Sequence, residues 1–274
     1  MHIAVIAPGA MGAAVARRLH DRGAEIGVTL AGRGAGSAAR AAGLLAFDSE
    51  AALAGWADVV LSILPPGEAL NLARRLAPLL RPGTLYADCN AVSPQTVRRV
   101  ADALPEARFV DAGIIGGPPG ASGPGPRFYA SGAHAAALDP LIGWGIDWRP
   151  IEGGIGAASA LKMSYAGITK GLTALGSAMV LGAEASGAAG ALRAELMASQ
   201  PDLMRYFSRS VPDMFDKAYR WVAEMEEISA FLGDSPANGI HASMARLYEA
   251  LAQDRAAGTA DGPVAKLAAF FPKP

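Results

Sequence analysis

A lysine stands inside an apolar helical segment. Lys162 lies in ASALKMSYAGITKGLTAL, residues 158–175, where Ala, Leu, Met and Gly predominate. Such a lysine extends to solvent along its apolar stem, pairs with another group, or occupies a pocket for a chemical purpose. In a pocket, a positioned lysine can act as a general acid or base. On a helix, Tyr165 and Thr169 share the face of Lys162, so the three side chains form the first candidate site.

A glycine-rich turn near the N-terminus is the second candidate site. The segment VIAPGAMGAAVA, residues 5–16, follows an apolar run typical of a strand and opens a helix. This is the context of the dinucleotide fingerprint G-x-G-x-x-G, with Ala7 in place of the first glycine. Gly9 lets the main chain approach a pyrophosphate at the helix N-terminus, and Gly12 lets helix and strand pack closely. The predicted cofactor contacts are Ala7, Pro8, Gly9, Ala10, Met11 and Gly12.

The end of the second predicted strand indicates which nucleotide is bound. An NAD site usually places Asp or Glu there to hold the ribose 2′-hydroxyl. The segment TLAGRGAGSAAR, residues 29–40, has no acid and offers Arg33, Ser37 and Arg40 instead. Arginine can stack on adenine and grip a 2′-phosphate, so NADP(H) is predicted over NAD(H). The alternative is that these arginines are solvated loop residues.

The elements around these residues alternate between strand and helix. Strands are predicted at residues 2–7, 25–30, 57–64, 84–89, 108–114, 126–132 and 147–151. Helices are predicted at residues 10–20, 67–80, 93–104 and 133–144, with Ser93 and Pro94 as the cap and first residue of the third. This alternation predicts an α/β domain over residues 1–152 with a doubly wound, mostly parallel sheet.

The character of the chain changes after residue 152. Residues 153–187 keep helical periodicity without turn signals, and helical segments follow to the end of the chain. Breaks are expected at Pro201, Pro212, residues 233–236 and Gly258. We therefore expect an all-α domain over residues 153–274, entered by one long helix. That helix is apolar on more than one face, which favours a homodimer formed through this domain.

Composition restricts the possible partners. The 274 residues carry a formal net charge of −1, so no global field attracts nucleic acid or anionic lipid. Cys89 is the one cysteine and the N-terminus lacks a signal-peptide pattern, which together favour a reducing, cytoplasmic location. No stretch qualifies as a membrane span, and the four histidines lack metal-ligand spacing, so neither a membrane nor a metal is expected.

Four motifs in order resemble the β-hydroxyacid dehydrogenase and 6-phosphogluconate dehydrogenase superfamily. APGAMG is similar to its G-x-G-x-M-G turn, and DAGIIGG, residues 111–117, to its substrate loop D-A-P-V-S-G-G. GAASALKMSYA, residues 156–166, matches its catalytic segment at Gly156 and Lys162, and GAEASG, residues 182–187, resembles its A-E-x-x-G. Two further segments, DAGIIGGPP and RWVAEMEEI, look like a branch with a C-terminal domain of unknown function.

The resemblance implies roles for particular residues. Lys162 would be the general acid/base on the substrate oxygen. Tyr165 stands where the family has an asparagine and could supply a hydroxyl in its place, while Ile115 replaces the family's serine. Asn90 would meet the nicotinamide ribose or carboxamide, unless it is simply a turn asparagine. The other implied contacts are Ile63, Leu64 and Pro65 for the cofactor, and Gly113, Ile115, Gly116, Gly117 and Thr169 for the substrate.

These features together predict an NADP(H)-dependent oxidoreductase. It would transfer a hydride between nicotinamide and a small hydroxy or carbonyl compound, with Lys162 moving the proton. No basic cluster accompanies Lys162, so 6-phosphogluconate is not the expected substrate. An imine reductase on the same fold and a non-catalytic NADP(H)-binding sensor remain alternatives. Lys162 argues against both, whereas Tyr165 is compatible with the imine reductase.

Overall fold

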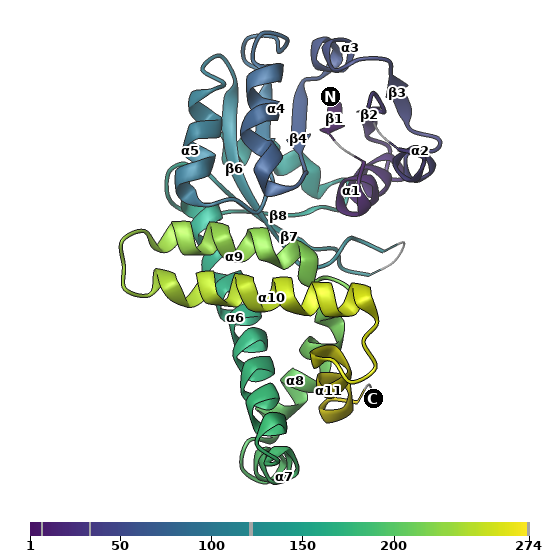
Figure 1. The fold of residues 1–274 in the computed structure, drawn as a ribbon. Helices are drawn as coiled ribbons and strands as arrows, with labels where there is room; N and C mark the ends of the chain where they lie inside the picture. Colours follow the sequence, from purple (N-terminus) through teal and green to yellow (C-terminus); the bar gives the residue numbers. More distant parts are fainter. Residues whose placement is uncertain (7, 33, 121–122, 273–274) are drawn as a thin grey trace. The chain divides into compact units, whose positions relative to one another are not determined.

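The computed structural model describes residues 1–6, 8–32, 34–120 and 123–272. The chain divides into two compact units, Met1–Met163 and Ser164–Pro274. The first is a sheet covered by helices and the second is helical (Figure 1). The sequence predicts a boundary near residue 152, whereas the division falls within one long helix. Side chains of the sheet accept hydrogen bonds from the first turn of that helix, so this turn belongs to the first unit.

The first unit is built on one eight-stranded sheet with strand order β3-β2-β1-β4-β5-β6-β7-β8. All neighbouring strands are parallel except β6 and β7. The predicted doubly wound, mostly parallel sheet is confirmed. The strands are β1 (His2–Ile6), β2 (Glu25–Thr29), β3 (Leu45–Phe47), β4 (Val59–Ser62), β5 (Leu85–Asp88), β6 (Arg108–Ile115), β7 (Arg127–Ser131) and β8 (Asp147–Pro150).

Helices cover both faces of this sheet because its strands are apolar on both sides. Along β1, Ile3 and Val5 belong to one buried cluster, and the alternate residues Ala4 and Ile6 belong to the other. The helices and 3₁₀ segments of the unit are α1 (Ala10–His20), α2 (Ala35–Arg40), α3 (Glu50–Trp56), η1 (Pro66–Glu68), α4 (Ala69–Leu76), α5 (Pro94–Asp102) and η2 (Ala135–Ile142).

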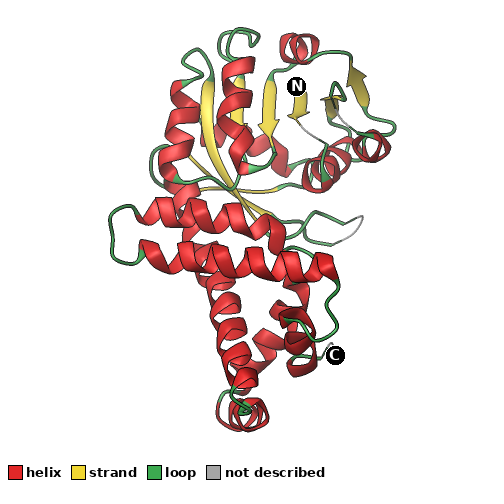
Figure 2. Cartoon of the chain, in the orientation of Figure 1, coloured by secondary structure: helices red, strands yellow, loops and turns green. Residues whose placement is uncertain are grey.

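The second unit is all-α, as predicted. The long helix α6 (Ala157–Ala185) begins in the first unit and continues into the second. Gly176 allows Phe207 to pack against it, since an added Cβ would lie 2.7 Å from that ring. In Figure 2, α9 (Ala218–Leu232) and α10 (Asn238–Ala257) run side by side as a hairpin. The remaining helices are α7 (Ala189–Ser199), α8 (Pro201–Met214) and α11 (Pro263–Phe270).

Two local expectations differ from the structure. Pro212 lies inside α8 rather than between helices, because it falls in the last turn and the helix ends at Met214 soon afterwards. The helix expected at residues 133–144 is a 3₁₀ segment, Ala135–Ile142, that contains Pro140. The predicted cap of α5 is confirmed: the Ser93 side chain accepts the N–H of Thr96 at 3.2 Å, and Pro94 is the first helical residue.

Among the described residues, no helix has both the length and the apolar character that crossing a bilayer requires.

Candidate active site

The glycine turn lies where the strand order of the sheet reverses. β1 is flanked by β2 on one side and β4 on the other, so the connections leaving β1 and β4 run to opposite faces (Figure 1). Ligands of such sheets bind outside the carboxyl ends of the strands at this position. Gly9 caps α1 in an extended conformation without a side-chain hydrogen bond, and Gly12 is buried. The main-chain N–H groups at the start of α1 thus suit a pyrophosphate. Ala7 lies outside the described residues.

The loop after β4 is held by Asn90. The Asn90 side chain accepts the N–H of Leu64 at 2.7 Å and donates to the hydroxyl of Ser62 at 2.9 Å. Its own main-chain N–H donates to Asp88 at 3.0 Å. Asn90 is only 3% exposed, so its amide serves the shape of the loop that carries Ile63, Leu64 and Pro65. Ile63 is buried, Leu64 half-buried and Pro65 exposed.

Arg40 of α2 lies beside the glycine turn. Arg40 donates to the carbonyl of Pro8 at 3.2 Å and to the hydroxyl of Ser37 at 3.2 Å. This pair stands beside the turn in which a dinucleotide phosphate would lie. Arg33, the other predicted determinant of the nucleotide, lies outside the described residues. A guanidinium and a hydroxyl both bind phosphate oxygens, so Arg40 and Ser37 can hold a phosphate group near the turn.

A row of buried polar residues crosses the sheet at the carboxyl end of its parallel part. Ser62 of β4 aligns with Asp88 of β5, which aligns with Asp111 of β6. Asp111 in turn aligns with Ser131 of β7. Each of the four is at most 1% exposed. Two neighbouring carboxyl groups in one buried row repel each other when both are ionised.

The two acids of this row have different surroundings. Asp111 accepts four hydrogen bonds, whereas one carboxylate oxygen of Asp88 has no partner among the described residues. Burial, with a smaller contribution from the charge of Asp111, raises the pKa of Asp88 to about 7 although hydrogen bonds from Asn90 lower it. Burial also raises the pKa of the Tyr86 hydroxyl and of the Cys89 thiol. Asp88 is therefore the group in the row that holds a proton near neutral pH.

Asp111 fixes the start of α6. Its carboxylate accepts the N–H of Gly156 at 2.8 Å, the N–H of Ser159 at 3.1 Å and the hydroxyl of Ser159 at 2.7 Å. Ser131 donates to the same carboxylate at 3.1 Å and accepts the N–H of Ala158 at 3.0 Å. Side chains from β6 and β7 thus provide the N-terminal cap of α6, which its own sequence does not supply. A carboxylate at this end of a helix also interacts favourably with the helix dipole.

This anchoring places Lys162 against β6. A Cβ added at Gly113 would lie 2.9 Å from Cβ of Lys162 and 3.0 Å from the carbonyl oxygen of Ala158, so only glycine allows this approach. Gly113 lies two residues past Asp111, where the pairing of β6 with β5 ends. Lys162 is half-buried and forms no hydrogen bond or ion pair with another described residue. The lysine is thus held beyond the carboxyl end of the parallel strands.

The remaining candidate residues take different positions. Gly116 and Gly117 are exposed after β6, and Gly116 has a φ of +128° that favours glycine. Ile115 is buried at 8% exposure. Tyr165 is 48% exposed, while the Thr169 hydroxyl donates to the carbonyl of Tyr165 at 2.9 Å and is directed back to its own helix.

Sequence reasoning did not assign Asp111, Ser131 or Ser159. An acid inside the apolar strand segment RFVDAGI was a usable signal, because a buried carboxylate requires partners. Those partners come from β7 and α6, and the sequence alone did not pair them with Asp111. Among the described residues, no cluster of His, Cys, Asp and Glu suits a metal ion.

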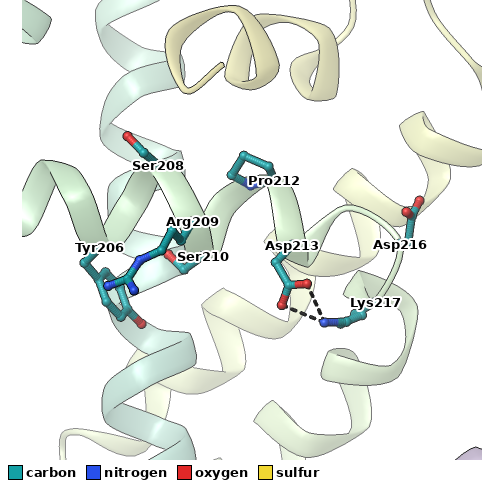
Figure 3. A pocket seen from close by; sticks show the side chains of 8 residues that line it. All are labelled: Tyr206, Ser208, Arg209, Ser210, Pro212, Asp213, Asp216 and Lys217. Carbon is teal, nitrogen blue, oxygen red and sulfur yellow. Dashed lines mark hydrogen bonds and ion pairs between the residues drawn. The ribbon is translucent and has the colours of Figure 1, made fainter. Parts of the chain in front are cut away.

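A pocket of about 590 Å³ lies elsewhere, on α8 and the turn after it (Figure 3). Two of its charged lining residues, Asp213 and Lys217, pair at 2.6 Å, and none of the candidate residues lines it. The lining residues are Tyr206, Ser208, Arg209, Ser210, Pro212, Asp213, Asp216 and Lys217. The candidate site therefore shares no residue with this recess.

The sheet order and the glycine turn define a nicotinamide-dinucleotide-binding protein. The chain belongs to the family described as the NAD binding domain of 6-phosphogluconate dehydrogenase, which matches residues 2–139. Residues 183–251 match a domain of unknown function, DUF1932. The predicted superfamily, with its C-terminal domain of unknown function, is confirmed.

Known proteins share this architecture. A conserved protein whose structure resembles 3-hydroxyacid dehydrogenases is 28% identical, with a TM-score of 0.73 over 94% of this chain and 100% of that one. A hypothetical protein from Sinorhizobium meliloti 1021 is 25% identical, with a TM-score of 0.71 over 98% of this chain and 96% of that one. An uncharacterized 28.5 kDa protein from Methanothermus fervidus is 32% identical over 43% of this chain, and that match spans 45% of the relative.

Two enzymes share the fold at lower identity. Mycobacterium tuberculosis 3-hydroxyisobutyrate dehydrogenase is 22% identical, with a TM-score of 0.65 over 98% of each chain. A reductive aminase from Aspergillus terreus, solved with NADPH and ethyl-5-oxohexanoate, is 17% identical, with a TM-score of 0.57 over 98% of this chain and 99% of that one. The fold is therefore that of NAD(P)-binding hydroxyacid dehydrogenases, and reductive aminases also adopt it.

Proposed function

We propose that the chain is an NADP(H)-dependent oxidoreductase that acts on a small hydroxy acid or the matching carbonyl compound, with Lys162 as its general acid/base. The observation that carries this proposal is the position of Lys162. Asp111 accepts four hydrogen bonds and so fixes the start of α6, and Gly113 leaves room for the lysine stem. Lys162 therefore lies beyond the carboxyl end of the parallel strands. Its stem lies against protein, and its ammonium group forms no hydrogen bond or ion pair with another described residue.

The residues of the chain then have distinct tasks. The nicotinamide, when bound, accepts or supplies the hydride at the substrate carbon. Lys162, as the neutral amine, takes the proton from the substrate hydroxyl during oxidation, and as the ammonium it returns that proton during reduction. The exposed N–H groups of Gly116 and Gly117 suit a substrate carboxylate, and the Tyr165 hydroxyl assists in orientation. Ile115 in place of the family's serine favours a substrate with an apolar substituent.

The surroundings of the glycine turn support NADP(H) as the preferred cofactor. Segment 29–40 contains no acid to hold a ribose 2′-hydroxyl. Arg40 already reaches the carbonyl of Pro8 and the hydroxyl of Ser37. A 2′-phosphate beside this pair gains charge-assisted hydrogen bonds that the 2′-hydroxyl of NAD(H) cannot match.

An exposed apolar stripe on α6 supports a homodimer. Five apolar side chains repeat at alternating spacings of three and four residues, the spacing of a helix-packing seam. Their exposed fractions run from 38% to 65%, which is high for a continuous apolar row. The members of this α6 stripe are Tyr165, Ile168, Leu172, Leu175 and Met179.

A screen of cofactor oxidation and reduction tests the proposal. The purified protein is assayed with NADP⁺ against short 3-hydroxy acids, and with NADPH against aldehydes and cyclic imines. Turnover of a hydroxy acid supports the proposal. Turnover of imines alone identifies an imine reductase, for which Tyr165 is the observation in favour. Binding of NADPH without any turnover identifies a cofactor sensor.

A further inference from the structure

Arg18 is a buried arginine on the helix that begins at the glycine turn. It is 7% exposed and, among the described residues, makes no ion pair. Arginine is rarely buried without a partner, because its guanidinium has five donors to satisfy. Its partners are instead two main-chain carbonyl groups about a hundred residues away in sequence, Gly120 at 2.9 Å and Gly123 at 3.0 Å.

Both carbonyl groups belong to the segment that joins β6 to β7, residues 116–126. The sequence of this segment, GGPPGASGPGP, has no charged residue and four prolines, so it has few N–H groups with which to order itself. In the described parts of residues 117–125, no main-chain N–H donates to another main-chain carbonyl. Arg18 therefore supplies hydrogen bonds that the described residues of the segment do not make with one another.

The fit between Arg18 and the segment is close on both sides. A Cβ added at Gly125 would lie 2.5 Å from Nη1 of Arg18 and 3.3 Å from its Cζ. Gly125 thus leaves the room that the guanidinium occupies. The same segment begins with Gly116 and Gly117, which the proposed function assigns to the substrate carboxylate.

We propose that Arg18 is a positioning residue that clasps the 116–126 segment to α1 and so fixes the Gly116 and Gly117 N–H groups for substrate. The clasp joins the helix that begins at the cofactor turn to the segment that receives the substrate. Arg18 itself touches neither ligand. The link to substrate rests on the proposed function, whereas the ordering of the segment does not.

Hydrogen–deuterium exchange tests the clasp without any knowledge of the substrate. Arg18→Met keeps the apolar stem and removes the donors. We expect the amides of the β6–β7 ladder next to the segment, at Ile114, Ile115, Arg127 and Phe128, to exchange at least about tenfold faster while the rest of the sheet and α1 keep their protection. Arg18→Lys restores a cation and should recover part of the protection. Arg17→Met is the matched control, because Arg17 is the adjacent arginine and bonds instead to the carbonyl of Ala42.

Kinetics separates positioning from general support of the fold. With the hydroxy acid that the unmodified protein oxidises best, Arg18→Met should raise KM about tenfold and leave kcat and the NADPH dissociation constant within about threefold. If the unmodified protein oxidises none of the acids, the proposed function fails, and the exchange comparison still decides the clasp.

Several results overturn the clasp. Unchanged exchange at the ends of β6 and β7 next to the segment does so. Equal acceleration throughout the sheet, or the same acceleration in Arg17→Met, also does so. If Arg18→Met does not fold, Gly125→Ala displaces the guanidinium from the other side and must produce the same local acceleration. Its failure to do so in a folded protein also contradicts the proposal.

Discussion

At the scale of single residues, Lys162 is positioned by its neighbours rather than by a partner of its own ammonium group. Asp111 and Ser131 hold the N–H groups at the start of α6, and Gly113 admits the lysine stem. A fixed stem with a free ammonium group is the arrangement that proton transfer needs, because an ion pair would hold the proton in place. We therefore expect the position of Lys162 to depend on Asp111.

Asp88 gives the protein a predicted dependence of stability on pH. Its pKa is about 7 in the folded chain against an ordinary value of 3.8, because burial disfavours the charged form. The folded state thus holds a proton that the unfolded state releases as pH rises from about 4 to 7, and this difference costs roughly 4 kcal/mol of stability by neutral pH. Above pH 7 both states are ionised and the cost stays constant.

Asp88→Asn should remove this cost. The amide keeps an oxygen for the N–H of Asn90 and carries no charge. We expect the variant to be more stable than the parent at pH 7.5 and to match it near pH 4, measured by urea unfolding followed by circular dichroism. The control is Asp147→Asn, an acid on β8 whose pKa is lowered by Arg149 and which should not stabilise the protein. An Asp88→Asn variant less stable than the parent at pH 7.5 contradicts a buried Asp88 whose ionisation destabilises the fold.

At the scale of elements, the long periodic segments were predictable and the short ones were not. Strands β1, β2 and β4–β8 follow apolar runs bounded by turn residues, and α6 follows sustained helical periodicity. The region from α2 to α3 escaped prediction because β3 has three residues and α2 is a six-residue helix of Ala, Gly, Ser and Arg, too short for a periodic signal.

The candidate site was also only partly predictable, because it combines local sequence motifs with contacts between residues that are far apart in the chain. The glycine turn and Lys162 are local patterns and were recognised from the sequence. The anchoring of Lys162 depends on Asp111, Ser131 and Gly113, which are far from it in the chain. Local patterns do not specify such long-range hydrogen bonds, although the isolated acid in β6 marks where one must form.

The α6 stripe predicts how the proposed homodimer will respond to a charge. Leu175→Lys places an ammonium group in the middle of the apolar row, where burial in an interface leaves it unpaired. We expect the dissociation constant of the homodimer to rise at least about a hundredfold, which sedimentation or light scattering across a concentration series measures. Met197→Lys on α7 is the control, since Met197 is also exposed and apolar, at 53%, but lies outside the stripe. A parent protein that is monomeric at micromolar concentration contradicts the assignment of the stripe.

At the scale of the whole molecule, cofactor binding should stabilise the fold and reveal the preferred nucleotide. A ligand at a hundred times its dissociation constant stabilises the native state by about 2.7 kcal/mol. We expect NADPH to bind about 1–3 kcal/mol more tightly than NADH, and so to give the larger rise in melting temperature at equal concentration. Arg40→Ala should remove most of the difference, whereas Arg209→Ala in the other unit should not. Equal shifts with both nucleotides in the parent protein contradict the proposed preference.

The central claim is that Lys162 moves the proton, and turnover of two variants tests it most directly. Lys162→Met keeps a similar apolar stem, so the fold and NADPH binding should persist while turnover falls by about 10²–10⁴, the contribution of one positioned proton donor. Tyr165→Phe removes one exposed hydroxyl and should cost less than Lys162→Met. The reverse order, with Lys162→Met retaining most activity and Tyr165→Phe losing it, would contradict the account and assign the proton to Tyr165.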